Sequence, residues 1–250
     1  MIGLRAPAKL TWYLEITGRR SDGYHLIRSE MLAVALDDIV VIDETDDYVR
    51  VFNPFSTPVP QDHTNLVARA LKLVGRTAGV TVEKSIPVGG GLGGGSADAA
   101  AILRWAGGVS SEAALSLGGD VPFCQLGGRA LVEGVGEHLT PLDFAARTVT
   151  LITPDFGVAT ADCYDAYDEL TSSGQRPEGR NHLEAAARLV EPRLARALDW
   201  LRAELGHEVH LAGSGSTMFV EGIVGEPHLE MAGPDGMLSF YRVSARPREA

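Results

Sequence analysis

The chain has 250 residues, enough to bury a sizeable hydrophobic core, so we expect one large domain or two smaller ones. Hydrophobic residues make up 45% and charged residues 22% of the sequence, a composition that excludes an extended disordered chain. The 22 Lys and Arg residues against 33 Asp and Glu residues give a net charge of -11, which disfavours binding to nucleic acids and to anionic membrane surfaces.

The first half of the chain begins with two predicted strands, residues 9–16 and 31–42, which are rich in apolar and β-branched residues and are separated by the turn sequence GRRSDGYH. Apolar residues at helical spacing then predict a helix over 64–78, with Thr64 as its cap. A short strand is expected at 80–84. A glycine loop follows and leads directly into an alanine-rich helix that begins near Ser96 or Ala97.

Further along, a short helix with Ser110 or Ser111 as its cap and a strand near 129–132 are expected. The β-branched run at 148–153 predicts another strand. Two helical stretches are expected within 181–205, separated near Pro192. We therefore expect an α+β fold with a boundary between residues 143 and 148.

Cys124 and Cys163 lie far apart and form no CxxC pair, so the sequence suggests neither a disulfide scaffold nor a cysteine zinc site. The opening residues MIGLRAPAKL lack the apolar core of a signal peptide. No run approaches the roughly 18 apolar residues that a membrane span needs. We expect a cytoplasmic protein with two reduced thiols.

The glycine loop, Gly89 to Gly95, has six glycines in seven residues. Glycine lets the backbone approach a ligand closely, and successive N–H groups can form an anion-binding concavity. The helix that follows adds unpaired N–H groups and the positive end of its dipole. The loop therefore predicts a binding site for the phosphates of a nucleotide, with the hydroxyl of Ser96 as a further contact.

Other glycine motifs fit this stretch less well. A Walker A loop needs GxxxxGK, and no lysine stands at that place. A formal GxGxxG exists at Gly89, Gly91 and Gly94, but Pro87 and Val88 separate it from the preceding strand, unlike the usual dinucleotide site. A bare linker is also disfavoured, because ordering glycine costs roughly 0.5–1 kcal/mol relative to alanine where its freedom is not needed.

Three segments resemble, in order, the three motifs of the GHMP kinases: APAKLTWYLEITGRRSDGYHLI, SIPVGGGLGGGSADAAA and LAGSGSTMF. The shorter segments GDVPF, EGVGE and NHLEAAA also match the family, so the resemblance covers most of the chain. It implies an α+β, two-domain GHMP kinase fold with the active site in the cleft between the domains. On this basis we expect an N-terminal domain over 1–145 and a C-terminal domain over 146–250.

The DGYH segment resembles the branch of this family whose small-molecule substrate carries a cytidine diphosphate group. The resemblance implies an ATP-dependent kinase that phosphorylates the 2-hydroxyl of a methylerythritol unit, in the non-mevalonate route to isoprenoid precursors. Mg2+ is expected with ATP, because phosphoryl transfer generally requires it. Two alternatives stay open: a kinase for another small alcohol, of homoserine or mevalonate type, and a nucleotide-binding module without catalysis.

The resemblance also assigns roles to residues. It implies that Asp120 is the catalytic base and Lys9 its partner, although a cap aspartate and a surface lysine are the structural alternatives. ATP contacts are expected from Asn65, Leu66, Lys84, Pro87, Val88, Gly89, Gly90, Gly91, Leu92, Gly93, Gly94, Gly95 and Ser96. Substrate contacts are expected from Thr11, Tyr24, His25, Val135, Tyr164, Gly213, Ser214 and Gly215, with Tyr24 and His25 binding cytosine. The sequence assigns no metal ligands and no oligomeric state.

Two features depart from the family pattern. Thr11 stands where the family usually has asparagine, and its hydroxyl replaces only part of the amide's hydrogen bonding. After Phe219 the family normally has a helix, but GEPHLEMAGPDG contains two prolines and three glycines. We therefore expect a shortened C-terminal region.

Overall fold

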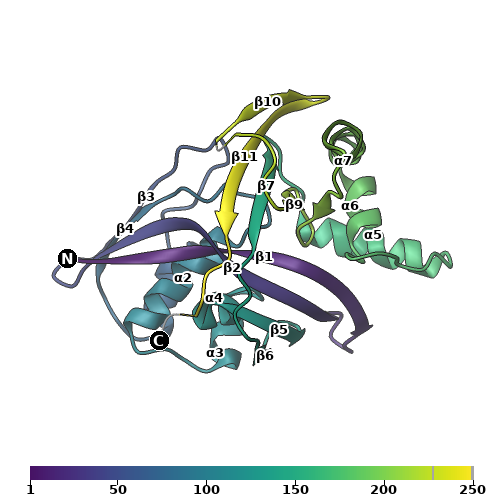
Figure 1. Ribbon diagram of the computed structural model, residues 1–250. Coiled ribbons are helices and arrows are strands. Elements are labelled where there is room, and N and C mark those ends of the chain that lie inside the picture. Colours follow the sequence, from purple (N-terminus) through teal and green to yellow (C-terminus); the bar gives the residue numbers. More distant parts are fainter. Residues whose placement is uncertain (227, 249–250) are drawn as a thin grey trace.

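The computed structural model describes residues 1–226 and 228–248 and shows two sheets, each with its own helices (Figure 1). In the described residues the first sheet has the strand order β3-β4-β2-β5-β6, with β1 paired to β2. The second has the order β10-β11-β7-β9-β8. The mixture of strands and helices agrees with the expected α+β class.

The first sheet and its helices come from residues 2–141. The strands are β1 (Ile2–Arg19), β2 (His25–Asp43), β3 (Tyr48–Phe52), β4 (Gly79–Glu83), β5 (Arg129–Gly134) and β6 (His138–Pro141). The helices are α1 (Leu66–Leu73), α2 (Gly94–Trp105), α3 (Ser111–Leu115) and α4 (Val121–Leu126).

β1 and β2 form one long antiparallel hairpin, which projects to one side of the molecule (Figure 1). Its register runs from Ile2 opposite Ile42 to Arg19 opposite His25. The two strands predicted at 9–16 and 31–42 are present but extend well beyond those limits. The extension matters because it carries the tip, residues 20–24, to helix α5 of the second half.

Helix α2 packs against β1 and β2 with its alanine-rich face. Ala97, Ala99, Ala100 and Ala101 are fully or almost fully buried. Small side chains allow the helix axis to lie close to the sheet, so the helix start is fixed relative to both long strands. It begins at Gly94, two residues before the predicted start.

The second sheet comes from residues 148–244, and its helices lie together on one side of it (Figure 1). Its strands are β7 (Thr148–Pro154), β8 (His210–Leu211), β9 (Met218–Glu221), β10 (Glu230–Gly233) and β11 (Gly236–Ser244). Its helices are α5 (Thr160–Ser172), α6 (Glu184–Val190) and α7 (Pro192–Leu205). None of the helices in the described ranges is both long and apolar enough to cross a membrane.

The two halves share buried contacts. Leu151, Phe219 and Val243 of the second sheet belong to the core of the first, and the Trp12 and Phe219 ring centroids lie 5.4 Å apart. After β11 the chain returns to the first half, where the Arg246 N–H donates to the Ala33 carbonyl. The division at residues 145 and 146 stays a prediction.

Two local predictions need correction. Thr64 does not cap the helix predicted at 64–78; Asn65 does, because its Oδ1 accepts from the Val67 N–H, whereas the Thr64 hydroxyl donates to Asp62. The helix also ends at Leu73, before Gly75, whose φ of 63° breaks it. The expectation of a shortened C-terminal region agrees with the structure: apart from residue 227, which is not described, β9 connects to the β10–β11 hairpin without a helix.

A buried charge cluster supports the entrance to the glycine loop. The Lys84 ammonium donates to Asp38 Oδ2 and lies 2.7 Å from Asp98 Oδ2. The other Asp38 oxygen accepts from the backbone N–H groups of Ser85 and Ile86. Burial raises the pKa of Asp98 to about 7. The charge of Asp38 adds to this increase, and the charge of Lys84 opposes it.

We predict that this raised pKa makes the stability of the protein depend on pH. The folded state holds the Asp98 proton up to about pH 7, whereas the unfolded chain releases it near its model value of 3.8. Wild-type stability therefore falls relative to Asp98→Asn between about pH 4 and pH 7, with a limiting slope of about 1.4 kcal/mol per pH unit. Urea unfolding of both proteins across this range measures the difference, and parallel pH profiles would contradict it.

We also predict that Gly91 tolerates no side chain. Its φ is 76°, and a Cβ there would lie 2.5 Å from the Gly215 carbonyl oxygen. Gly91→Ala should lower the free energy of unfolding by more than about 1 kcal/mol. Gly95→Ala is the control, since its Cβ would meet only Leu66 Cδ1 at an ordinary 3.5 Å. Equal melting temperatures for the two variants would contradict the prediction.

Candidate active site

The glycine loop lines a cavity of about 230 Å³ beside the start of α2. Gly93 caps the helix in the left-handed conformation, with a φ of 69°, and no side chain caps the first N–H groups of α2. These groups are therefore available to an anion, as the sequence predicts for a phosphate site. All of the predicted ATP-contacting residues except Ser96 line this cavity.

The far wall of this cavity is formed by residues 58–60 and the start of α1. Asn65 and Leu66 lie there, and the Asn65 side chain already makes two local contacts: it caps α1 and donates to the Pro60 carbonyl. Asn65 therefore holds the wall in shape. Lys84 also lines the cavity, but its ammonium is held by Asp38 and Asp98.

Asp120 and Lys9 form an ion pair next to the loop. Lys9 Nζ lies 3.2 Å from Asp120 Oδ2 and also donates to the Thr11 hydroxyl at 3.2 Å. The Lys9 side chain is only 7% exposed, which excludes the surface-lysine alternative. Asp120 occupies the position before α4 but makes no capping hydrogen bond, so its carboxylate is directed to Lys9 instead.

Gly93 brings the phosphate loop against this pair. A Cβ on Gly93 would lie 2.8 Å from Lys9 Cγ and 3.7 Å from Asp120 Oδ2. The Lys9 N–H also donates to the Leu92 carbonyl, which joins β1 to the loop. The acid, the amine and the loop backbone therefore meet at one point.

The third segment, Gly213 to Gly215, closes the site from the second half. A Cβ on Gly213 would lie 3.8 Å from Lys9 Nζ and 3.5 Å from the Thr11 hydroxyl. The Ser214 hydroxyl pairs with Thr160 at 2.8 Å, which ties the segment to α5. The Thr217 N–H donates to the Gly90 carbonyl, so this segment also touches the glycine loop.

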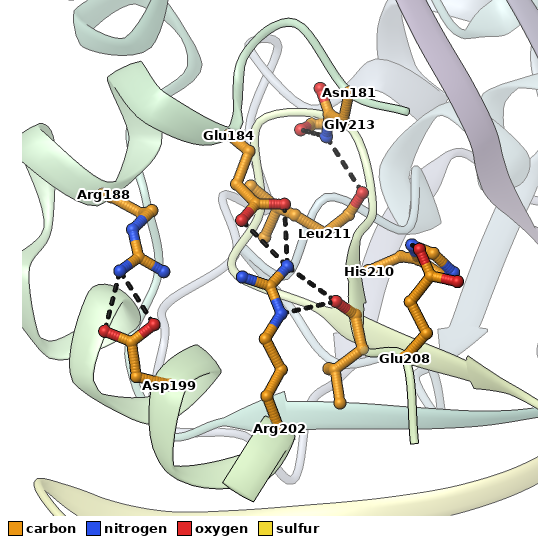
Figure 2. Close-up of polar contacts among 10 residues, drawn as sticks. Asn181, Glu184, Arg188, Asp199, Arg202, Glu208, His210, Leu211 and Gly213 are labelled. Carbon is orange, nitrogen blue, oxygen red and sulfur yellow. Dashed lines mark hydrogen bonds and ion pairs between the residues drawn. The ribbon is translucent and has the colours of Figure 1, made fainter. Parts of the chain in front are cut away.

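Asn181 holds this third segment in place. Its amide nitrogen donates to the carbonyls of Leu211 and Gly213 at 2.9 and 2.7 Å (Figure 2). Its Oδ1 accepts from the Leu183 N–H, so both ends of the buried amide are used. The NHLEAAA segment was matched to the family without a role for this asparagine, which only the folded contacts reveal.

A second cavity, of about 600 Å³, opens on the other side of Asp120. Asp120 lines it together with Tyr24, His25, Val135 and Tyr164, four of the predicted substrate-contacting residues. Tyr24 is 64% exposed at the hairpin tip, and His25 is stacked on Tyr164 with ring centroids 4.7 Å apart. Thr11 and the third segment do not line this cavity; they lie behind Lys9.

Tyr164 lines the second cavity together with Asp120. Burial, with a further contribution from the charge of Asp120, raises the pKa of its phenol to about 12. The hydroxyl stays protonated near neutral pH. Tyr164 can therefore donate a hydrogen bond or stack, but it does not serve as a base.

Several residues of the site were missed from the sequence because their signals are distant in the chain. Asp38 and Asp98 surround Lys84 from two elements, and Asp168 of α5 pairs with His25. Helix α5 itself was not predicted, since its alternation of polar and apolar residues is weak. The part of the chain that the structure describes has no group of three His, Cys, Asp or Glu side chains placed to bind a metal ion.

The family description "GHMP kinases N terminal domain" matches residues 65–128, which include the glycine loop and Asp120. Over 231 residues the chain is 38% identical to the 4-diphosphocytidyl-2-C-methyl-D-erythritol kinase of Paracoccus denitrificans, covering 86% of this chain and 84% of that protein. The Nitrosomonas eutropha enzyme of the same name is 35% identical over 242 residues, covering 86% of each chain.

Solved structures agree with these sequence matches. A crystal structure of 4-(cytidine 5'-diphospho)-2C-methyl-D-erythritol kinase superimposes with a TM-score of 0.71 at 30% identity, covering 98% of this chain and 99% of that one. A Leishmania major mevalonate kinase shares the fold, with a TM-score of 0.59 at 10% identity over 100% of this chain and 97% of that one. The chain thus belongs to the 4-diphosphocytidyl-2-C-methyl-D-erythritol kinase family of the GHMP kinases.

Proposed function

We propose that this chain transfers the γ-phosphate of ATP to the 2-hydroxyl of 4-diphosphocytidyl-2-C-methyl-D-erythritol, in the non-mevalonate route to isoprenoid precursors. The observation that carries the proposal is the position of Asp120, which lines the second cavity and lies beside the glycine loop of the first. A nucleotide in one cavity and an alcohol in the other would meet at this carboxylate.

The first cavity suits ATP. The uncapped N–H groups of α2 and the glycine backbone favour the triphosphate without a cationic side chain. Asn65 and Leu66, at the far wall, and Lys84, beside the loop, would contact the adenosine part. The third segment adds backbone dipoles on the side of Lys9, where the transferred group would lie.

The second cavity suits a substrate with a nucleobase. Tyr24 presents an exposed aromatic face, and His25 and Tyr164 supply polar edges beside it. The methylerythritol end would then extend toward Asp120. A small polyol or amino acid would leave this aromatic end of the cavity unused, which favours the cytidine substrate over a homoserine or mevalonate type.

The proposed reaction uses Asp120 as the base and Lys9 as its electrostatic partner. The Asp120 carboxylate accepts the proton of the 2-hydroxyl, the hydroxyl oxygen bonds to the γ-phosphorus, and the bond from that phosphorus to the bridging oxygen breaks as ADP leaves. The Lys9 ammonium, 3.2 Å from Asp120, offsets the negative charge of the transferring group. Thr11 accepts a hydrogen bond from Lys9 and so orients it.

Mg2+ bound with ATP would neutralise part of the charge of its phosphates. The ion commonly keeps several water ligands and takes few from protein, which fits the lack of an acidic cluster in the described ranges. Two further expectations from the sequence stay predictions: the division into domains over 1–145 and 146–250, and the cytoplasmic location.

Asp120→Asn tests the proposed base. Without a proton acceptor, kcat should fall by roughly 100- to 10,000-fold, while the melting temperature and ATP binding stay near wild type. ADP release with ATP, Mg2+ and the cytidine substrate measures the effect. Asp199→Asn, on the exposed side of α7, is the control. Full-rate turnover by Asp120→Asn would remove the assignment.

Tyr24→Ala tests whether the substrate carries a nucleobase. Loss of a stacking face worth about 1–3 kcal/mol should raise KM for the cytidine substrate by roughly 5- to 150-fold and leave KM for ATP unchanged. Phe52→Ala is the matched control, since Phe52 is 63% exposed and lies on β3, away from the cavity. An unchanged KM in Tyr24→Ala would favour a different small alcohol as substrate.

A further inference from the structure

The hairpin tip that carries Tyr24 and His25 is held to the second half of the molecule by one carboxylate, Asp168 of α5. Asp168 Oδ1 lies 2.7 Å from His25 Nε2, and Asp168 Oδ2 lies 2.9 Å from Arg19 Nη1. Arg19 ends β1 and His25 begins β2, and the two are opposite each other in the hairpin. Asp168 therefore joins both strands to α5 at the tip of the hairpin.

Both partners of Asp168, His25 and Arg19, line the second cavity. The Arg19 Nε group donates to the Gly23 carbonyl at 3.0 Å, so Arg19 also orders the turn that leads to Tyr24. Arg19, Gly23, Tyr24 and His25 all line the cavity, whereas Asp168 does not. Asp168 can therefore act on a bound substrate only through these neighbours.

The His25 ring is fixed on three sides. One face stacks on Tyr164, the edge of Tyr167 approaches with a centroid distance of 5.9 Å, and Nε2 is bound by Asp168. A carboxylate paired with Arg19 is an acceptor, so the proton of the hydrogen bond belongs to His25 Nε2. Within the described residues Nδ1 has no hydrogen-bond partner, so it is the ring nitrogen left for a ligand.

We propose that Asp168 is a positioning residue for the cytidine end of the substrate. This inference rests on the proposed function and extends it to a residue outside the cavity. Asp168 holds His25 and, through Arg19, the turn before Tyr24 in the arrangement that receives the base. It takes no part in phosphoryl transfer, since among the described residues its carboxylate contacts His25 and Arg19 at the hairpin tip, and not Lys9 or Asp120.

Asp168→Asn is the direct test. An amide has one acceptor oxygen, so Asp168→Asn either loses one of the two contacts or donates its N–H to His25 Nε2. In the second case the imidazole proton moves to Nδ1, the nitrogen left for the ligand. KM for the cytidine substrate should rise at least about 10-fold, with kcat within about 3-fold of wild type and KM for ATP unchanged. Glu169→Gln is the matched control: it is the next residue of α5, is exposed and loses the same charge.

Asp168→Glu keeps two acceptor oxygens and should recover part of the lost affinity, a recovery that a purely structural defect would not show. An Asp168→Asn protein with the kinetics of Glu169→Gln would overturn the inference. So would a kcat reduced as strongly as kcat/KM.

Calorimetry with CDP separates this inference from the proposed function. If wild type binds CDP about 10-fold more tightly than Asp168→Asn does but shows no turnover, the inference stands and the kinase proposal fails. If wild type phosphorylates the cytidine substrate and Asp168→Asn has the same KM, the inference fails and the kinase proposal stands. No binding of CDP by wild type would overturn the inference.

Discussion

The close approach of backbone to backbone around the glycine loop is the constraint on which the rest of the site depends. At Gly91 the loop meets the Gly215 carbonyl, and at Gly93 it meets the side chain of Lys9, at separations that leave no room for a Cβ. The contacts place the N–H groups at the start of α2 beside the Lys9–Asp120 pair. The proposed phosphate site and the proposed base thereby lie side by side.

Charge is arranged in three separate groups around this centre. Lys9 and Asp120 lie at the junction of the two cavities, Lys84 is held between Asp38 and Asp98 beneath the loop, and Asp168 joins the hairpin tip to α5. Each group fixes a different part of the site. The overall charge of -11 is therefore no obstacle to an anionic substrate, since local N–H groups and paired cations face the cavities.

The sequence points to candidate site residues more readily than to the scaffold that holds them. The glycine loop, Lys9, Asp120 and Tyr24 were found because each stands within a short motif whose residue types imply a role. Twelve of the thirteen predicted ATP contacts, all but Ser96, line one cavity, yet whether they bind ATP stays a prediction. Four residues were missed because their hydrogen-bond partners lie 14 to 143 residues away in the chain: Asp38, Asp98, Asp168 and Asn181. A short sequence motif cannot predict contacts between residues so far apart.

The ends of the helices and strands could also be predicted where they depend on neighbouring residues, but not where they depend on contacts distant in the chain. The two helices near Pro192 and the Ser110 cap follow local rules and were predicted correctly. The β1–β2 hairpin is longer than its apolar stretch because pairing continues through Gly18 and Arg19 to the tip, where polar residues reach α5. That extension is what places Tyr24 and His25 opposite Tyr164.

A crystal structure with a nonhydrolysable ATP analogue and the cytidine substrate tests the central claim most directly. We expect the triphosphate on the N–H groups of the loop, the cytosine between Tyr24 and Tyr164, and the 2-hydroxyl oxygen within hydrogen-bond distance of Asp120, facing the γ-phosphorus. An ATP analogue bound outside the glycine cavity, or a terminal phosphorus remote from Asp120, would contradict the account.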